Sequence, residues 1–258
     1  MTTWKIERCT VADAAALARN NMSAFWEDPN WKLIWSKETT LDMLIENNAK
    51  RYPRILATDR EKKRHEKAVD PATGELVGYA RWVLPSEHLA AEDGSPEWAE
   101  AQVPDVSDEE KARFEELAKS ARLATRKEAD GMDDRNDEVL ARLLAAGTYI
   151  KFEYLAVHPA NKGKGIGSAL VESGIRHAEK IGVPLFTMAY KAGRGIYERL
   201  GFKEVERVVQ DATKYGGTGE YGAYFMVYDV PKKAPMSKSQ GLGNPREECN
   251  DLGGNNGE

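Results

Sequence analysis

The chain has 258 residues and a mass of 28.7 kDa, with 41% hydrophobic and 31% charged residues. This composition is typical of a globular protein and argues against a collagenous or wholly disordered one. The formal charge of −5 argues against nucleic-acid binding as the main role. No segment approaches the roughly 20 unbroken apolar residues that span a bilayer, so we expect neither a membrane span nor a membrane partner.

Cysteine and histidine usage gives no sign of a metal site or a disulfide framework. The two cysteines, Cys9 and Cys249, lie almost a whole chain apart. The four histidines never show the His-x-x-x-His spacing of a zinc site. The first ten residues carry charges where a secretory signal would place its apolar stretch. We therefore expect a cytoplasmic protein that binds no metal.

Two segments differ from the rest of the chain in composition. Residues 232–258 hold five Gly and four Asn with scarcely an apolar side chain, which predicts a disordered C-terminal tail. Residues 86–147 hold 17 acidic and 8 basic residues, which makes them an insert with a net charge of −9. The remaining residues have about the size of one domain, so we expect one domain over residues 1–231.

The elements follow one another in an alternating order. A strand is predicted over 4–9, a helix after Thr10, another helix over 38–51, and strands over 54–60 and 75–84. The charged run 60–67 is interpreted as a solvated loop. In the insert, Ser107 and Glu110 form a capping box ahead of a helix, and a second helix ends at Gly147.

The C-terminal half continues this alternation. Strands are predicted over 149–157, 184–190, 202–209 and 223–230, and helices over 167–181 and up to Gly201. This order indicates an α/β or α+β fold, with a single mixed sheet of about six to seven strands flanked by helices.

The turn between strand 149–157 and helix 167–181 contains three glycines, Gly163, Gly165 and Gly167. Without Cβ atoms in the way, several main-chain N–H groups can converge on one anion. The unpaired N–H groups and the positive dipole end of the following helix face the same point. The pattern predicts a phosphate or pyrophosphate site with Lys162 and Lys164 at its rim.

Two common phosphate motifs do not fit this turn. A P-loop requires G-x-x-x-x-G-K-[ST], which is absent here. A dinucleotide site requires G-x-G-x-x-G against the strand and an acidic residue after the next strand, whereas this turn reads G-x-G-x-G and strand 184–190 ends without an acid. ATP bound by a P-loop and a nicotinamide cofactor are therefore disfavoured, and a bare turn stays as an alternative.

A second motif, GIYERLGF, follows about thirty residues later at 195–202. Together, two segments resemble the acetyl-CoA signatures of the GNAT superfamily of acyl-CoA-dependent N-acetyltransferases. They are LAVHP with KGKGIGSALV, and the later IYERLGF. The resemblance covers residues 149–209, and residues 1–84 share only the order of elements with the family. The segment AGRGIYERLGF is similar to fungal members in particular. The sequence departs from the family at Lys162, where Gln or Arg is usual, and at Tyr190, where many members have Asn or Ser.

The resemblance implies that acetyl-CoA lies where two adjacent parallel strands splay apart, with its pantetheine arm hydrogen-bonded to a strand edge. The loop amides would bind the pyrophosphate. The cofactor-binding residues implied are Leu155, Ala156, Val157, Lys162, Gly163, Lys164, Gly165, Ile166, Gly167, Ser168, Tyr190 and Tyr197.

The resemblance also implies direct attack by a neutral amine on the thioester, through a tetrahedral intermediate. Tyr197 would protonate the departing thiolate, with core packing beneath Phe202 as the alternative. Glu153 lies two residues before Leu155, so period-two alternation places both on one face, toward the splayed edge. There Glu153 would act as general base and contact the substrate, with a solvated strand residue as the alternative.

The acceptor site is predicted after the first helix, where Trp26 and Trp31 are followed by Trp35; core burial is the alternative. The insert 86–147 is expected to form a lid on the acceptor side and to attract a cationic amine. We expect an N-acetyltransferase acting on a primary amine of a small molecule. The alternatives are a protein or peptide N-acetyltransferase and an inert acyl-CoA-binding regulatory module, and a homodimer is left open.

Overall fold

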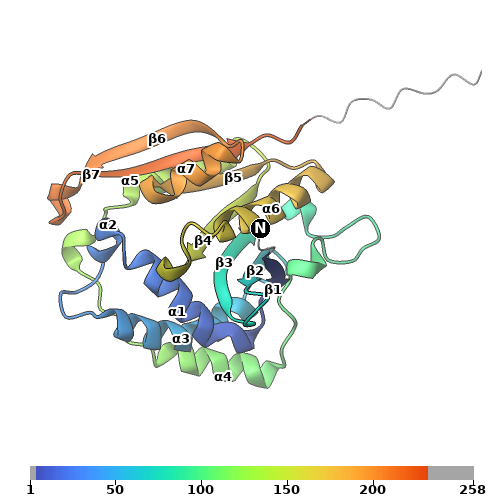
Figure 1. Cartoon of the computed structure of the whole chain (residues 1–258), viewed down its shortest axis with the longest axis horizontal. Coiled ribbons are helices and arrows are strands. Elements are labelled where there is room, and N and C mark those ends of the chain that lie inside the picture. Colours follow the sequence, from blue (N-terminus) through green and yellow to red (C-terminus); the bar gives the residue numbers. More distant parts are fainter. Residues whose placement is uncertain (1–3, 232–258) are drawn as a thin grey trace, which may run out of the picture.

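Seven strands form one sheet in the computed structural model, which describes residues 4–231 (Figure 1). The strands are β1 (Lys5–Arg8), β2 (Lys63–Val69), β3 (Leu76–Val83), β4 (Ile150–Val157), β5 (Leu185–Tyr190), β6 (Lys203–Asp211) and β7 (Glu220–Tyr228). Their order across the sheet is β1-β2-β3-β4-β5-β7-β6. Neighbours are antiparallel except β4 and β5, which run parallel. The predicted single mixed sheet flanked by helices is therefore confirmed.

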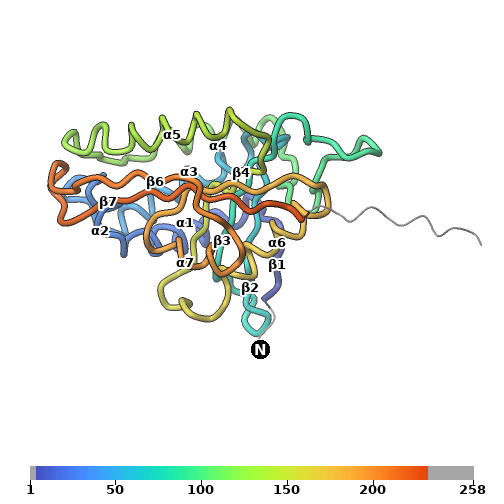
Figure 2. The backbone as a smooth tube through the Cα atoms, turned by 90° about the horizontal axis from the view of Figure 1, so that it is seen from above, coloured from blue at the N-terminus to red at the C-terminus, as the bar shows by residue number. Residues whose placement is uncertain are grey.

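Helices cover both faces of this sheet. They are α1 (Ala14–Phe25), α2 (Pro29–Lys32), α3 (Leu41–Ala57), α4 (Asp108–Lys119), α5 (Asp134–Ala145), α6 (Ile166–Ile181) and α7 (Lys191–Arg199). In Figure 2, α5 lies on one side of the sheet while α6 and α7 lie on the other. Among the helices of residues 4–231, none is both long and apolar enough to cross a membrane.

The two faces have separate cores. On the α6 and α7 face, Trp82, Phe152 and Leu170 belong to the largest buried cluster. On the opposite face, α1 and α3 cover Tyr79 in a second cluster, and the apolar side of α5 packs against Phe186 and its neighbours in a third. Alternating side chains of β4 and β5 therefore face different helices.

Two predicted elements between residues 51 and 67 are wrong. The strand predicted over 54–60 is the end of α3, which continues through Pro53 to Ala57. The run 60–67, interpreted as a solvated loop, contains most of β2, in which Arg64, His65 and Glu66 are buried. A run of charged residues favours the interpretation of a solvated loop. Such residues can nevertheless be buried where their charged groups have polar partners.

Arg64 and Glu66 have such partners, whereas His65 contacts Tyr79 OH through Nδ1 and its Nε2 has no partner within the described residues. The Arg64 guanidinium donates to the main-chain oxygens of Arg60 and Lys63, each at 2.8 Å, and of Glu97. The Glu66 carboxylate accepts from Trp82 Nε1 at 3.0 Å and from Ser173 Oγ at 2.8 Å. Burial raises the pKa of Glu66 to about 7, although those two hydrogen bonds act in the opposite direction.

The acidic insert does not form a separate unit. Its first helix, α4, has the predicted capping box of Ser107 and Glu110 and packs against α3. The following strand-like segment pairs with the α2–α3 loop, since Arg126 N–H donates to Ile34 O at 2.8 Å. Its second helix, α5, lies over β5, β7 and β6. The predicted disordered tail, 232–258, lies outside the described residues.

Candidate active site

The parallel strands β4 and β5 stop pairing halfway along their length. Their register runs from Ile150 with Leu185 to Phe152 with Thr187, yet β4 continues to Val157 and β5 to Tyr190. Beyond Phe152 the two facing edges therefore have main-chain groups without a neighbouring strand. Such an edge can accept an extended ligand as an added strand.

The region between β4 and β5 beyond Phe152 and Thr187, where the strands no longer pair, is called the opening. A bulge in β4 lies at its start. Trp82 pairs with Phe152, whereas the preceding Arg81 pairs with Tyr154, so Glu153 is the extra residue. A bulge shifts the side-chain alternation by one residue. Phe152 accordingly stacks on Trp82 on the α6 face, at 3.9 Å between ring centroids, and Tyr154 packs on the α1 face.

The bulge has two consequences for the predicted site. Glu153 contacts Arg81, whose guanidinium lies over the Tyr154 ring, while Leu155 packs in the cluster of the α6 face. The expectation that Glu153 and Leu155 share a face is therefore wrong. The bulge also changes the side to which the main-chain groups point. Ile150 N–H donates to Pro184 O, on the β5 side of β4. Because main-chain groups alternate sides along a strand, the one extra residue turns those of Leu155 and Val157 toward β5.

The glycine-rich turn follows directly on β4 and precedes α6. Gly163 and Gly165 have φ angles of 77° and 79°, a region that residues with a Cβ atom occupy at a cost. Gly165 is the N-cap of α6. A Cβ atom at Gly163 or Gly165 would meet nothing within 4 Å, whereas one at Gly167 would lie 3.0 Å from Ile196. The turn thus keeps its outer side open, next to the unpaired N–H groups of the first helical turn.

The basic residues of this turn have partners nearby. Lys162 forms an ion pair with Glu27, which follows α1. Lys164 Nζ donates to Asn161 Oδ1 at 2.7 Å, and its main-chain oxygen accepts from Trp4 Nε1 at 2.9 Å. Of the predicted cofactor-binding residues, Ile166 points its side chain into the core and is 1% exposed. The other loop residues stay near the surface, with Ser168 half-buried.

Tyr197 on α7 lies at the inner end of the opening. Its ring meets Phe152 edge-on, with centroids 5.8 Å apart, and also packs on Phe202. Burial raises the pKa of Tyr197, against a smaller lowering effect of a hydrogen bond with Thr187. Phe152 and Thr187 are the last pair between β4 and β5, so the phenol adjoins the point where the strands part. The side chain also packs in the core, and its predicted catalytic role stays a prediction.

Glu153 is held between two cations. One carboxylate oxygen lies 2.7 Å from Arg81 Nε and the other 3.2 Å from Lys151 Nζ. Burial acts to raise the pKa of Glu153, but the charges of Arg81 and Lys151 outweigh it and keep the pKa below its usual value. The carboxylate is therefore ionised at neutral pH, and its role as a base stays a prediction.

Tyr190 and Trp31 meet in a small aromatic cavity on the α1 and α5 face. The cavity has a volume of about 30 Å³. Tyr190 stacks on Tyr221 with centroids 5.5 Å apart, and Trp31 packs against Phe25 at 5.8 Å. The Tyr190 side chain thus lies on the face opposite α6, so its predicted contact with the cofactor stays a prediction. The Trp26 ring is covered by the Lys32 ammonium at 4.9 Å and does not line this cavity.

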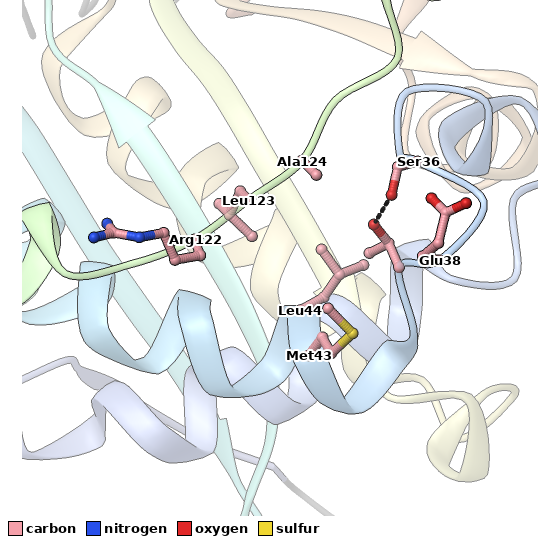
Figure 3. A pocket seen from close by; sticks show the side chains of 8 residues that line it. Ser36, Glu38, Met43, Leu44, Arg122, Leu123 and Ala124 are labelled. Carbon is pink, nitrogen blue, oxygen red and sulfur yellow. Dashed lines mark hydrogen bonds between the residues drawn. The ribbon is translucent and has the colours of Figure 1, made fainter.

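A larger hollow of about 450 Å³ lies between the start of α3 and residues 122–124 of the insert (Figure 3). Its lining is largely apolar and includes Met43, Leu44 and Leu123. In Figure 3 the Arg122 guanidinium extends away from the hollow, where it donates to Lys119 O at 3.0 Å. None of the predicted site residues lines it.

Sequence reasoning missed Asn20, which supports the end of β4. Its Nδ2 donates to Ala156 O at 3.1 Å, and its Oδ1 accepts from His158 N–H at 3.0 Å. The signal was present, because Asn20 and Asn21 follow Leu17 at i+3 and i+4, on the buried face of α1. A buried polar side chain on an apolar helix face requires partners.

Comparisons with known proteins give similarities in sequence and in fold. Residues 109–204 match the family model described as "Acetyltransferase (GNAT) domain". This segment runs from α4 into β6 and includes the opening and both motifs. No curated protein matches the sequence.

Solved structures of acetyltransferases also match. A structure described as histone acetyltransferase HPA2 and related acetyltransferase, from Corynebacterium glutamicum, has 17% identity and a TM-score of 0.53, covering 90% of this chain and 98% of that one. The Escherichia coli ribosomal-protein-S18-alanine N-acetyltransferase has 14% identity, a TM-score of 0.43 and coverage of 91% and 99%. Naa20 of Chaetomium thermophilum, solved with a bisubstrate analogue, has 14% identity, a TM-score of 0.42 and coverage of 88% and 86%.

At 17% identity, the Corynebacterium glutamicum match indicates a common fold. The matched family model covers residues 109–204, and this segment is therefore identified as similar to a GNAT acetyltransferase domain.

Proposed function

We propose that the chain transfers an acetyl group from acetyl-CoA to a primary amine of a small molecule. The observation that carries this proposal is the early end of pairing between β4 and β5, at Phe152 and Thr187. Directly after β4 come the glycine-rich turn and the start of α6. An extended arm with a pyrophosphate at one end suits this combination of an unpaired strand edge and a helix N-terminus.

The residues present fit such a ligand. The main-chain groups of Leu155 and Val157 face the opening and have the spacing of a strand partner. Gly163 and Gly165 leave space on the outer side of the turn, where the N–H groups of residues 163–168 can donate to phosphate oxygens. Lys162 and Lys164 add positive charge to this rim.

Acetyl-CoA, when bound, supplies an acetyl group activated as a thioester. Transfer forms a bond between the amine nitrogen and the acetyl carbon and breaks the bond between that carbon and sulfur. Tyr197 donates its proton to the departing sulfur, which a phenol that stays protonated at neutral pH can do. A main-chain N–H beside Leu155 stabilises the oxygen that becomes negative during attack.

The attacking amine must first lose a proton, since alkylammonium groups have pKa values near 10. Glu153 is ionised and lies beside the bulge at the start of the opening. With a pKa below its usual value, Glu153 is a weak base toward the ammonium, so we propose that it accepts the proton through a water molecule.

A small acceptor is favoured by the size of the aromatic cavity. Its volume of about 30 Å³ accommodates one small group. The insert adds Met132 and Asp133 to the cavity wall, as a lid on the acceptor side would. A peptide acceptor would require an open groove beside Tyr190.

Two measurements on the full chain test this function. Calorimetry with coenzyme A should show saturable binding. A transfer assay with acetyl-CoA should detect acetylated product with small primary amines at higher kcat/KM than with lysine-containing or N-terminal peptides. Absence of coenzyme A binding would refute the proposal. Binding without transfer to any amine or peptide would instead indicate an acyl-CoA-binding regulatory module.

A further inference from the structure

The aromatic cavity between α2, β5, β7 and the insert combines rings with carboxylates. Trp31, Tyr190 and Tyr221 line it together with Asp28 and Asp133, and no Lys or Arg is among the lining residues. Phe25 connects the cavity to β4, since its ring lies 4.9 Å from that of Tyr154. The cavity therefore adjoins the end of β5 at Tyr190 and is separated from Tyr154 of β4 by the Phe25 ring.

Both carboxylates are fixed in place but keep one oxygen available. Asp133 Oδ1 accepts from Tyr221 OH at 2.5 Å and from Asn136 Nδ2 at 2.7 Å. Asp28 Oδ1 accepts from Asn30 N–H at 2.8 Å as the cap of α2. Across residues 4–231, neither Oδ2 has a hydrogen-bond donor, and no Lys or Arg nitrogen lies within 4.0 Å of either carboxylate.

Three aspartates lie close enough to Tyr190 to affect its pKa. The pKa of Tyr190 is raised to about 12, first by burial and then by the charges of Asp133, Asp137 and Asp28. Aromatic faces attract cations through their quadrupoles. A bare metal ion is a poor fit, because no group of three metal-ligating side chains exists in the described part of the chain. An organic ammonium suits two carboxylates and aromatic walls.

This ammonium cannot be the reacting nitrogen. Attack on a thioester requires the neutral amine, whereas a site with carboxylates favours the protonated form. The held cation and the attacking amine must therefore be two different groups. The cavity volume of about 30 Å³ suits one ammonium head group, comparable to a water molecule in size.

We propose that this cavity binds a second, protonated amino group of the acceptor, and that the acceptor is an alkyl diamine. The inference rests on the proposed function and adds the substrate class to it. Asp133, from the insert, and Asp28, from the start of α2, recognise the charged end. The alkyl chain then runs from the cavity toward the opening, where the second amine attacks. This gives the insert a role in specificity, through Asp133.

The test compares acceptors that differ only at the far end of the chain. With the full chain and saturating acetyl-CoA, kcat/KM is measured for α,ω-diamines of three to six carbons and for the matching amino alcohols, alkylamines and ω-amino acids. We expect the best diamine to exceed its amino alcohol at least about tenfold, the effect of one charged hydrogen bond. The ω-amino acid, with a negative end, should be the poorest.

Asp133→Asn should reduce the ratio of kcat/KM for the diamine to kcat/KM for the amino alcohol about tenfold. The variant can keep the hydrogen bond from Tyr221 through its amide oxygen, and coenzyme A binding checks that it is folded. The matched control is Glu138→Gln, which removes the same charge from an exposed position on α5 that does not line the cavity. In this control the ratio should not change.

Three outcomes would overturn the inference. If transfer is measurable and the ratio of kcat/KM for diamine and amino alcohol is near one at every chain length, the cavity does not bind a second, protonated amino group. The proposed acetyltransferase function would then still stand. An unchanged ratio in Asp133→Asn would remove the residue on which the inference depends. A lysine-containing peptide acetylated with higher kcat/KM than any diamine would assign the site to a macromolecular acceptor.

Discussion

Arg81 on β3 and Glu153 on β4 form an ion pair beside the bulge, with Arg81 Nε 2.7 Å from a carboxylate oxygen. Both side chains are largely buried, 20% and 26% exposed. The contact is an ion pair and not an aligned hydrogen bond, because Arg81 Nε has no hydrogen-bond partner within the described residues. The pair fixes Glu153 on the α1 face, away from Leu155 and on the side of the aromatic cavity.

Glu153→Gln should lower kcat about hundredfold if the carboxylate accepts the proton of the amine. Coenzyme A affinity should stay unchanged, since Glu153 faces away from the glycine-rich turn. Glu206→Gln is the matched control, because Glu206 also pairs with an arginine, Arg142, but does so on the distant strand β6. A loss of kcat in both variants would assign the effect to general destabilisation.

The pH profile gives an independent check on Glu153. Since Arg81 and Lys151 hold its pKa below the usual value, Glu153 loses its proton below pH 5. The kcat/KM of the native chain should therefore rise with pH only through the amine, with no separate step between pH 5 and 8. A step in that range that disappears in Glu153→Gln would contradict the lowered pKa.

Tyr197→Phe should lower kcat about hundredfold with little effect on coenzyme A affinity. The substitution removes only the hydroxyl, so the packing against Phe152 and Phe202 remains. Because burial raises the pKa of Tyr197, the phenol stays protonated through pH 10, and the native kcat should show no alkaline decline below that pH. An unchanged kcat in stopped-flow or steady-state assays would remove Tyr197 from the mechanism.

Gly165→Ala should weaken coenzyme A binding about tenfold or more and destabilise the fold by about 1 kcal/mol, the cost of a left-handed conformation with a Cβ atom. Gly74→Ala is a close control. Gly74 has a φ of 74°, and its added Cβ would also meet nothing within 4 Å, but it lies in the β2–β3 turn. The two variants should lose similar stability in denaturant titrations, and only Gly165→Ala should lose affinity in calorimetry. Equal affinities would exclude the turn as the pyrophosphate site.

The glycine-rich turn and the helix after it were predictable because local chemistry determines both. Glycines at positive φ and a helix that follows directly are readable from a few consecutive residues, and Gly165 indeed caps α6. The bulge at Glu153 was not predictable from its own strand, because the extra residue is defined only by pairing with Arg81 and Trp82 on β3. A single bulge was enough to reverse the face expected for Glu153.

The cavity depends on contacts still more distant in sequence. Asp133 meets Tyr221, 88 residues away, and Trp31 joins them from α2. The aromatic content near Trp31 suggested a pocket, whereas nothing local linked an insert aspartate to it. Strand β2 was missed for a related reason, because several hydrogen-bond partners of its buried Arg64 and Glu66 come from β3, α6 and the insert.

Arg64→Met should destabilise the chain by about 3 kcal/mol, because it leaves the carbonyl oxygens of Arg60, Lys63 and Glu97 without their buried donor. Lys63→Met is the control on the same strand, since Lys63 forms a surface ion pair with Asp59, and should cost less than about 1 kcal/mol. Denaturant titrations measure both values. Hydrogen exchange should also show faster opening at residues 97–103 in Arg64→Met, where the guanidinium holds the insert. Equal stabilities of the two variants would mean that the carbonyls find water when Arg64 is removed, and that β2 tolerates its buried charge without depending on it.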